Sequence, residues 1–204
     1  MAKIKDKAKP TIPPVAPGTY TAICVASIDI GEQLHKYKDK SNYQNMMMYT
    51  FELVGEFIEV DGKQEPRLLS RKFTFSKSEK SGLRKFVESW QGRKFSNEEF
   101  GDFDTNDMVG KEAMLGVVLN DTGEYANIDT IMGLPKGMSA GKPVSELIRF
   151  DMEPWNQEAF DKLPEWAQNR VKDSTQWQKQ HAPETVVDVQ PEPEKTADGE
   201  ECPI

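Results

Sequence analysis

The sequence has few residues of the kinds that build disulfide frameworks, metal centres or membrane spans. Its 204 residues include two cysteines, Cys24 and Cys202, and two histidines, His35 and His181. Residues scattered in this way exclude a disulfide framework and argue against a cysteine- or histidine-based metal cluster. No apolar run approaches the ~18 residues that a membrane span needs, and residues 1–7 lack the apolar stretch of a secretory signal. We therefore expect a cytoplasmic protein.

The sequence also lacks the motifs of several enzyme classes. There is no Walker loop, no dinucleotide-binding glycine fingerprint and no nucleophile elbow. Asp102, Asp104 and Asp107 bring three carboxylates together, but a calcium loop needs glycine at its sixth position, where Asp107 stands. A helix-capping turn is the simpler interpretation of this segment, and a magnesium-dependent nuclease is a distant alternative. We expect no catalytic residues, no cofactor and no bound metal.

The net charge of −8 is divided unevenly along the chain. Residues 182–204 carry seven acids and one base, whereas residues 67–94 carry nine bases and two acids. A second basic segment, residues 35–43, alternates lysines with tyrosines. Blocks of charge like these are typical of solvated faces and interaction tails. The acidic total therefore does not exclude a polyanionic partner such as nucleic acid.

The hydrophobic pattern predicts five strands and one central helix. The strands cover residues 18–28, 46–54, 67–75, 112–119 and 124–132, with a polar loop over 31–45. The spacing of Leu83, Phe86, Val87 and Trp90 predicts an amphipathic helix between the third and fourth strands. Three strands, a helix and two strands is the order of the OB-fold. We predict a mainly β fold with α additions: a five-stranded OB-fold-like barrel with a C-terminal helical extension.

Composition divides the chain into four parts. Residues 1–17 hold four prolines and are predicted to be a flexible N-terminal arm. Residues 18–137 form the predicted barrel domain, and residues 138–181 form a linker and the helical extension. Residues 182–204 are rich in proline and acids, which predicts a disordered acidic tail.

Basic residues interleaved with aromatic residues predict an interface for single-stranded DNA. Lysines and arginines follow the phosphates, while flat rings stack on bases for about 1–3 kcal/mol each. The candidates in the loop are Lys36, Tyr37, Lys38, Lys40 and Tyr43. The candidates in the third strand and the helix region are Arg71, Lys72, Phe73, Lys77, Lys80, Arg84 and Lys85.

The alternative interpretation is that these lysines form a solvated face and the aromatic rings belong to the core. Lys80, Arg84 and Lys85 could simply solubilise the helix. The residues expected in the core are Phe51, Phe75, Phe86 and Trp90. Tyr37 and Tyr43 stand in a polar segment and are expected to bind, whereas Tyr49 and Tyr125 fit either role.

The end of the acidic tail provides a second candidate for binding. Glu200 and Glu201 are followed by Cys202, Pro203 and Ile204. An acidic run with an apolar tip can dock in a basic-rimmed apolar pocket of a partner protein, or compete with nucleic acid for the protein's own basic groove. A tail that only solubilises the protein is the alternative.

Several short segments, in this order, resemble those of tailed-phage replication-module proteins described as single-stranded DNA-binding proteins with an OB-fold. They span residues 17–177 and include Pro17–Ala22, Lys77–Lys85, Trp90–Arg93, Tyr125–Ile128, Leu134–Gly137 and Leu163–Trp166. The resemblance implies a non-enzymatic protein of the bacterial host cytoplasm that coats and protects DNA during phage replication and recombination. It also implies that the tail recruits partner proteins, although tails of this kind end in acids followed by Pro-Phe and this chain ends in Cys-Pro-Ile.

Three further functional expectations stay open beside this one. A strand-annealing recombination protein would share most of these features. A protein-interaction module, such as an inhibitor of a host enzyme, would use the acidic tail without binding DNA. Self-association into a homo-oligomer is compatible with each of them.

Overall fold

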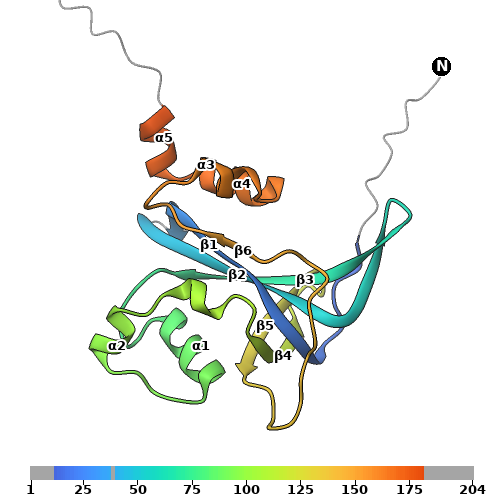
Figure 1. Cartoon of the computed structure of the whole chain (residues 1–204). Coiled ribbons are helices and arrows are strands. Elements are labelled where there is room, and N and C mark those ends of the chain that lie inside the picture. The colour runs from blue at the N-terminus through green and yellow to red at the C-terminus, as the bar shows by residue number, and fades with distance from the viewer. Residues whose placement is uncertain (1–11, 38–39, 182–204) are drawn as a thin grey trace, which may run out of the picture.

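The computed structural model describes residues 12–37 and 40–181, and its core is a mainly antiparallel six-stranded sheet. The hydrogen-bonded order is β3-β2-β1-β4-β5, and β6 pairs in parallel with β1 (Figure 1). The strands are β1 Gly18–Tyr37, β2 Lys40–Val60, β3 Lys63–Thr74, β4 Glu112–Leu119, β5 Ala126–Met132 and β6 Ile148–Phe150. The prediction of a mainly β fold with helical additions is confirmed.

The sheet differs from the predicted barrel in two respects. It has a sixth strand, β6, which was not predicted because three residues are too short to show a period. Within the described residues, no ladder of backbone hydrogen bonds joins the edge strands β3 and β5. The sheet is therefore not closed into a barrel by strand pairing.

The helices lie on opposite sides of the sheet (Figure 1). On one side, between β3 and β4, are α1 Gly82–Gln91, α2 Asn97–Gly101 and the short 3₁₀ helix η1 Thr105–Met108. On the other side are α3 Gln157–Asp161, α4 Glu165–Lys172 and α5 Thr175–His181. Among the described residues, no helix combines the length and apolar character needed to cross a membrane.

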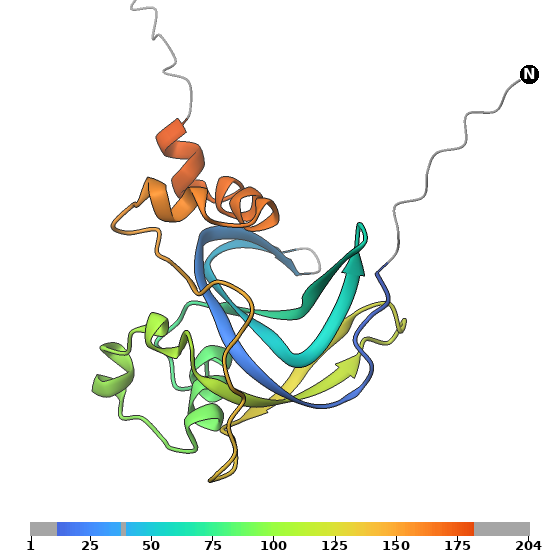
Figure 2. The same ribbon diagram turned by 45° about the vertical axis from the view of Figure 1, so that its right-hand side comes forward.

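The polar segment 31–45 is not a loop. β1 and β2 continue through it as one long hairpin, paired in register from Glu32 opposite Asn45 to Tyr37 opposite Lys40 (Figure 2). The prediction was wrong for two reasons. The ladder between two strands is made by backbone hydrogen bonds, which do not depend on the type of side chain. A strand with polar side chains on both faces shows no alternation of polar and apolar residues, so its sequence does not indicate a strand. We call residues 31–45 the β1–β2 ribbon.

The first hydrophobic cluster lies between the sheet and α1. It contains the rings of Tyr49, Phe51, Phe73, Phe86 and Trp90, whose neighbouring centroids lie 4.7–6.4 Å apart. Aromatic pairs at such distances contribute about 0.5–1.5 kcal/mol each beyond the area that they bury. The core positions expected for Phe51, Phe86 and Trp90 are confirmed.

Phe75 was also expected in the core, and this expectation is wrong. β3 ends at Thr74, one residue before Phe75, and the ring stays 43% exposed. Phe75 still donates its backbone N–H to the carbonyl of Asn45 at 2.7 Å. It therefore lies beside the base of the β1–β2 ribbon rather than over α1.

A second hydrophobic cluster joins β1 to the C-terminal helices. Ala26, Ile28 and Ile30 of β1 are buried in it, whereas Ala22 and Cys24 belong to the first cluster. A bulge between Cys24 and Ala26 inserts one residue and so turns the following side chains to the opposite face. One strand thereby contributes to two cores.

Candidate nucleic-acid interface

The β1–β2 ribbon presents an exposed tyrosine at a defined position. Tyr43 is 56% exposed and stands opposite Leu34, which is also exposed. Because β2 is regular here, Tyr43 lies on the same face as Met47 and Tyr49, beyond the end of the buried core. Phe75, the residue after β3, lies beside the ribbon through its backbone hydrogen bond to Asn45. Three apolar side chains, two of them aromatic, are thus open to solvent where the ribbon leaves the sheet.

The other predicted ribbon residues are described in part. The backbones of Lys36, Tyr37 and Lys40 belong to the ladder, with Lys36 opposite Ser41. Their side chains, and all of Lys38, lie outside the described residues.

Four of the predicted lysines are exposed on β3, on α1 and on residues 75–81 between them, which we call the β3–α1 connection. Lys72, Lys77, Lys80 and Lys85 each lack an ion pair within the described part of the chain. A hollow of about 440 Å³ in this region is lined by Lys72, Phe73, Ser76, Ser78, Lys80 and Gly82, among others. This connection therefore combines ammonium groups with hydroxyl groups, and both can donate hydrogen bonds to phosphate oxygens.

Phe73, predicted to stack on bases, is instead a core residue. Its side chain is buried, and its ring centroid lies 4.7 Å from that of Phe86 on α1. The alternation of β3 points it inward together with Leu69. It is not available to a nucleic acid.

Arg84 was predicted to bind phosphate, but the structure buries it to 4% exposure. Its Nε donates to Glu88 at 3.1 Å, one Nη donates to Asn97 at 2.7 Å and the other Nη donates to the carbonyl of Phe95. The guanidinium therefore fastens α1 to the chain that follows it. The spacing of Arg84 and Glu88, four residues apart on a helix, is the sequence signal that indicates this pairing.

Arg71 is also committed to the fold. One of its Nη atoms donates to the carbonyls of Ile128 and Asp129 at 2.8 and 3.0 Å. Its guanidinium lies 5.4 and 5.2 Å from the ring centroids of Phe73 and Phe86. This side chain spans the gap between the edge strands β3 and β5, which have no ladder of their own.

The basic surface is therefore smaller than the charge count of residues 67–94 implies. Glu88 accepts from Lys94 as well as Arg84, and Arg93 pairs with Glu99 at 3.3 Å. The hydrogen bond from Lys94, followed by those from Arg84 and the Phe95 amide, lowers the pKa of the Glu88 carboxyl to about 2 despite its burial. The charges left for an external anion are mainly those of the four exposed lysines.

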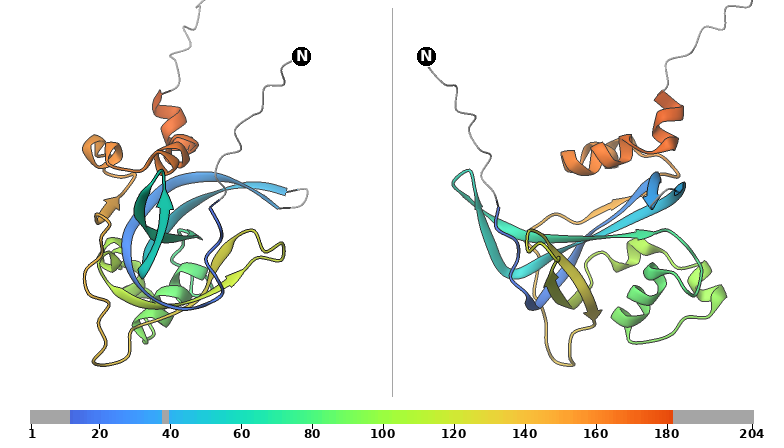
Figure 3. Two further views of the ribbon diagram at one scale, coloured as in Figure 1. Left: turned by 90° about the vertical axis from the view of Figure 1, so that its right-hand side faces the viewer. Right: turned by 180° about the vertical axis from the view of Figure 1, so that it is seen from behind.

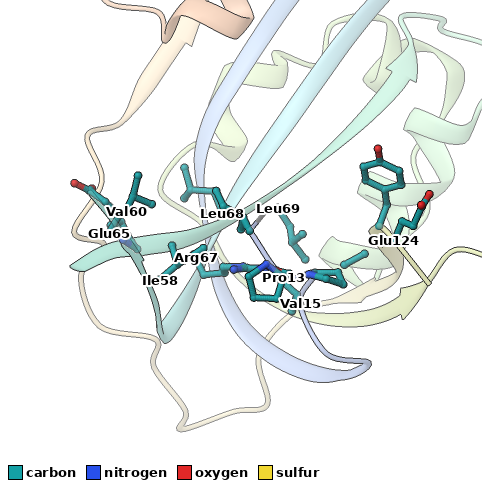
Figure 4. A pocket seen from close by; sticks show the side chains of 14 residues that line it. Pro13, Val15, Ile58, Val60, Glu65, Arg67, Leu68, Leu69 and Glu124 are labelled. Atoms are coloured by element: carbon teal, nitrogen blue, oxygen red, sulfur yellow. The ribbon is translucent and has the colours of Figure 1, made fainter. Parts of the chain in front are cut away.

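A larger apolar hollow, of about 620 Å³, was not predicted from the sequence (Figure 4). It lies between residues 12–15, the β2–β3 hairpin and the start of β5, and its apolar lining includes Pro13, Ile58, Val60 and Leu68. Tyr125, for which the sequence fits either role, is 67% exposed at its edge. These residues are far apart in the chain, so no local pattern could bring them together.

The three aspartates interpreted as a capping turn include one N-cap. Asp104 accepts the backbone N–H of Asn106 at 2.8 Å at the start of η1. No group of three potential metal ligands occurs within residues 12–37 and 40–181.

Comparison with known proteins returns no matching family model, no similar curated protein and no similar solved structure.

Proposed function

We propose that this protein binds single-stranded DNA without strong sequence preference and protects it during phage replication and recombination. The observation that carries the proposal is the exposure of Tyr43 and Phe75 beside Lys77 and Lys80 of the β3–α1 connection, which form no ion pair with any described residue. Exposed rings next to free ammonium groups are what a flexible, charged strand with unstacked bases requires. The function requires no catalytic residue.

The ribbon and the β3–α1 connection are close enough to act on one strand. Phe75 and Asn45 share a backbone hydrogen bond, and Thr74 donates to Gln44 at 3.1 Å. A strand crossing this junction would place bases against Tyr43 and Phe75 and phosphates near Lys77 and Lys80. We further infer that β1–β5 form an OB-fold-like barrel whose last seam is bridged by Arg71 instead of a strand ladder.

The proposal is tested by titrating a labelled oligonucleotide and following fluorescence anisotropy at increasing salt concentration. Because four lysines are exposed in this region, at most four phosphate contacts are expected. Log K should then fall with log salt with a slope no steeper than about −3, since each contact releases about 0.7 counterion from a single strand. A duplex of the same length is the control and should bind more weakly. Negligible binding at low salt, or equal binding of both forms, would refute the proposal.

Replacing Tyr43 with alanine should lower the affinity for the oligonucleotide by about fivefold to a hundredfold, because one stacking ring is lost. The salt slope should stay unchanged, because no charge is removed. Tyr125→Ala, which removes an even more exposed ring at the edge of the apolar hollow, should change the affinity much less. Anisotropy titrations of the three proteins decide the matter, and an unchanged affinity of Tyr43→Ala would exclude the ring from the interface.

The role of the acidic tail is a separate proposal. Glu200, Glu201, Pro203 and Ile204 lie outside the described residues. We infer that the tail recruits replication or recombination proteins and competes with DNA for the basic surface. Residues 1–181 alone should then bind the oligonucleotide more tightly than the full chain, and equal affinity would contradict the competition.

A further inference from the structure

The C-terminal helices lie against β1 where the β1–β2 ribbon begins (Figure 3). The contact is made at Gly31, which has a φ of +70° and follows a bulge between Asp29 and Gly31. A β-carbon at Gly31 would lie 2.9 Å from the Ser174 β-carbon and 2.9 Å from the Gln176 Oε1. Backbone and helix therefore approach as closely as glycine allows.

Gln176 of α5 bonds to the ribbon directly. Its Oε1 accepts the backbone N–H of Glu32 at 2.7 Å, and its Nε2 lies 3.5 Å from the Asn45 Oδ1 on the opposite strand. Thr175 donates its hydroxyl to the Glu32 carboxylate. One helix end thereby contacts both strands of the ribbon.

A second contact comes from α4. The Gln33 side chain donates to the carbonyls of Arg170 and Ile30 at 2.9 and 2.7 Å. Arg170 lies in the last turn of α4, where backbone carbonyls lack partners within the helix. The Gln33 side chain thus donates a hydrogen bond to a helix-end carbonyl that would otherwise need water as its partner.

The segments that make these contacts pack on the second hydrophobic cluster, α4 through buried residues and α5 through the partly buried Trp177. Ser174 is fully buried, and the Trp177 ring centroid lies 5.2 Å from that of Trp155 and 5.0 Å from that of Phe160. Val171 of α4 is buried in the same cluster as Ile30 of β1. The contacts to the ribbon are therefore made from a fixed support.

The ribbon needs such a support because it lacks neighbours in the sheet. β6 covers the outer edge of β1 as far as Ile28, and within the described residues no strand continues along it. Beyond that point the outward amides are bonded by side chains: Gly31 to Asp29 at 2.8 Å, and Glu32 to Gln176. An isolated two-stranded ribbon is only marginally stable in water and bends readily.

We infer that Ser174 and Gln176 are positioning residues that set the direction of the β1–β2 ribbon. This inference rests on the proposed function, because the ribbon carries Tyr43. With the ribbon held, Tyr43 stays in place relative to the β3–α1 connection before DNA arrives. Binding then costs less conformational entropy than it would with a mobile ribbon.

The test compares Gln176→Ala with Gln178→Ala. Gln178 is the same residue type two positions along α5, and its side chain is exposed. In Gln176→Ala we expect the amides of residues 32–37 and 40–45 to exchange hydrogen about fivefold to tenfold faster, in the absence of DNA. We expect the affinity for the oligonucleotide to fall by about threefold to tenfold. In Gln178→Ala both quantities should match the wild type.

A second pair of variants approaches the same contact from the ribbon. Gly31→Ala should push α5 away and reproduce the faster exchange and weaker binding. Gly55→Ala is its control, since Gly55 of β2 also has a positive φ, +81°, but no described atom lies within 4 Å of its β-carbon position. The comparison separates the effect of displacing α5 from the effect of placing alanine at a positive φ.

The outcomes distinguish the inference from the proposed function. If Gln176→Ala exchanges as slowly as Gln178→Ala, the helices do not hold the ribbon and the inference is wrong. Faster exchange with unchanged affinity would also overturn it, because the held direction would then not matter for binding. If the wild type binds no oligonucleotide, the proposed function fails, while the exchange data still decide whether the helices hold the ribbon.

Discussion

Arg84→Ala is expected to lower the free energy of unfolding by up to about 3–5 kcal/mol, because it leaves the buried Glu88 carboxylate with only the exposed Lys94 as its ion-pair partner. The carbonyl of Phe95 and the side chain of Asn97 lose a donor at the same time. Lys85→Ala, one residue along α1, removes the same charge from an exposed position. It should change stability by no more than about 0.5 kcal/mol and should instead reduce the salt slope of DNA binding.

Urea denaturation of both variants, read by tryptophan fluorescence, measures the difference. The pH dependence gives a second readout, because the folded protein holds the pKa of Glu88 below that of the unfolded chain. The stability contributed by Glu88 is present above the ordinary pKa of about 4.3 and is lost as pH falls toward 2. In Arg84→Ala this acid-dependent loss should shrink. A variant as stable as Lys85→Ala would show that the Arg84 network contributes nothing net.

Arg71→Ala is expected to lower the free energy of unfolding by about 2–4 kcal/mol. It removes two charge-assisted hydrogen bonds to β5 and a cation–π contact with Phe73 and Phe86, and no strand ladder replaces them. The amides at the facing edges of β3 and β5 should exchange faster, because water can enter between them.

Lys72→Ala is the matched control for Arg71→Ala. Lys72 follows Arg71 on β3 but is exposed and has no ion pair among the described residues. It should leave stability unchanged and weaken DNA binding modestly, mainly at low salt. Equal denaturation midpoints for the two variants would mean that Arg71 does not hold the seam between β3 and β5.

The sequence predicted those elements whose side chains alternate in polarity. The helix around Phe86 and Trp90 and the strands β4 and β5 show a period because one face meets the core and the other does not. The central part of β2 is buried on both faces, and its period comes from the polar Thr50 and Glu52 on the face opposite Tyr49. In the β1–β2 ribbon, the adjacent residues Leu34 and His35 point to opposite faces and both are exposed, so the sequence there resembles that of a loop. Both faces of β1 are buried around Val25, and the bulge there changes which of the two cores the even-numbered side chains enter, so no local pattern reveals it.

The sequence predicted which segment of the chain is rich in basic residues, but not which of those residues reach the surface. Counting bases in residues 67–94 identified the basic region, yet a count cannot separate Arg84, enclosed by Glu88 and Phe95, from the exposed Lys85 beside it. The positioning contact of Gln176 with Glu32 joins residues 144 positions apart, and only the packed structure brings them together.

The double role of β1 has a consequence for how the molecule melts. Because Ala22 and Cys24 serve one core and Ala26, Ile28 and Ile30 the other, the two cores share a covalent backbone of a few residues. If either core unfolds, β1 loses its ordered conformation, and the other core loses the β1 side chains that it contains. We expect a single cooperative heat-absorption peak in calorimetry, with equal calorimetric and van't Hoff enthalpies. Two separated peaks would mean that the side of the sheet with α1 and the side with the C-terminal helices unfold as independent units.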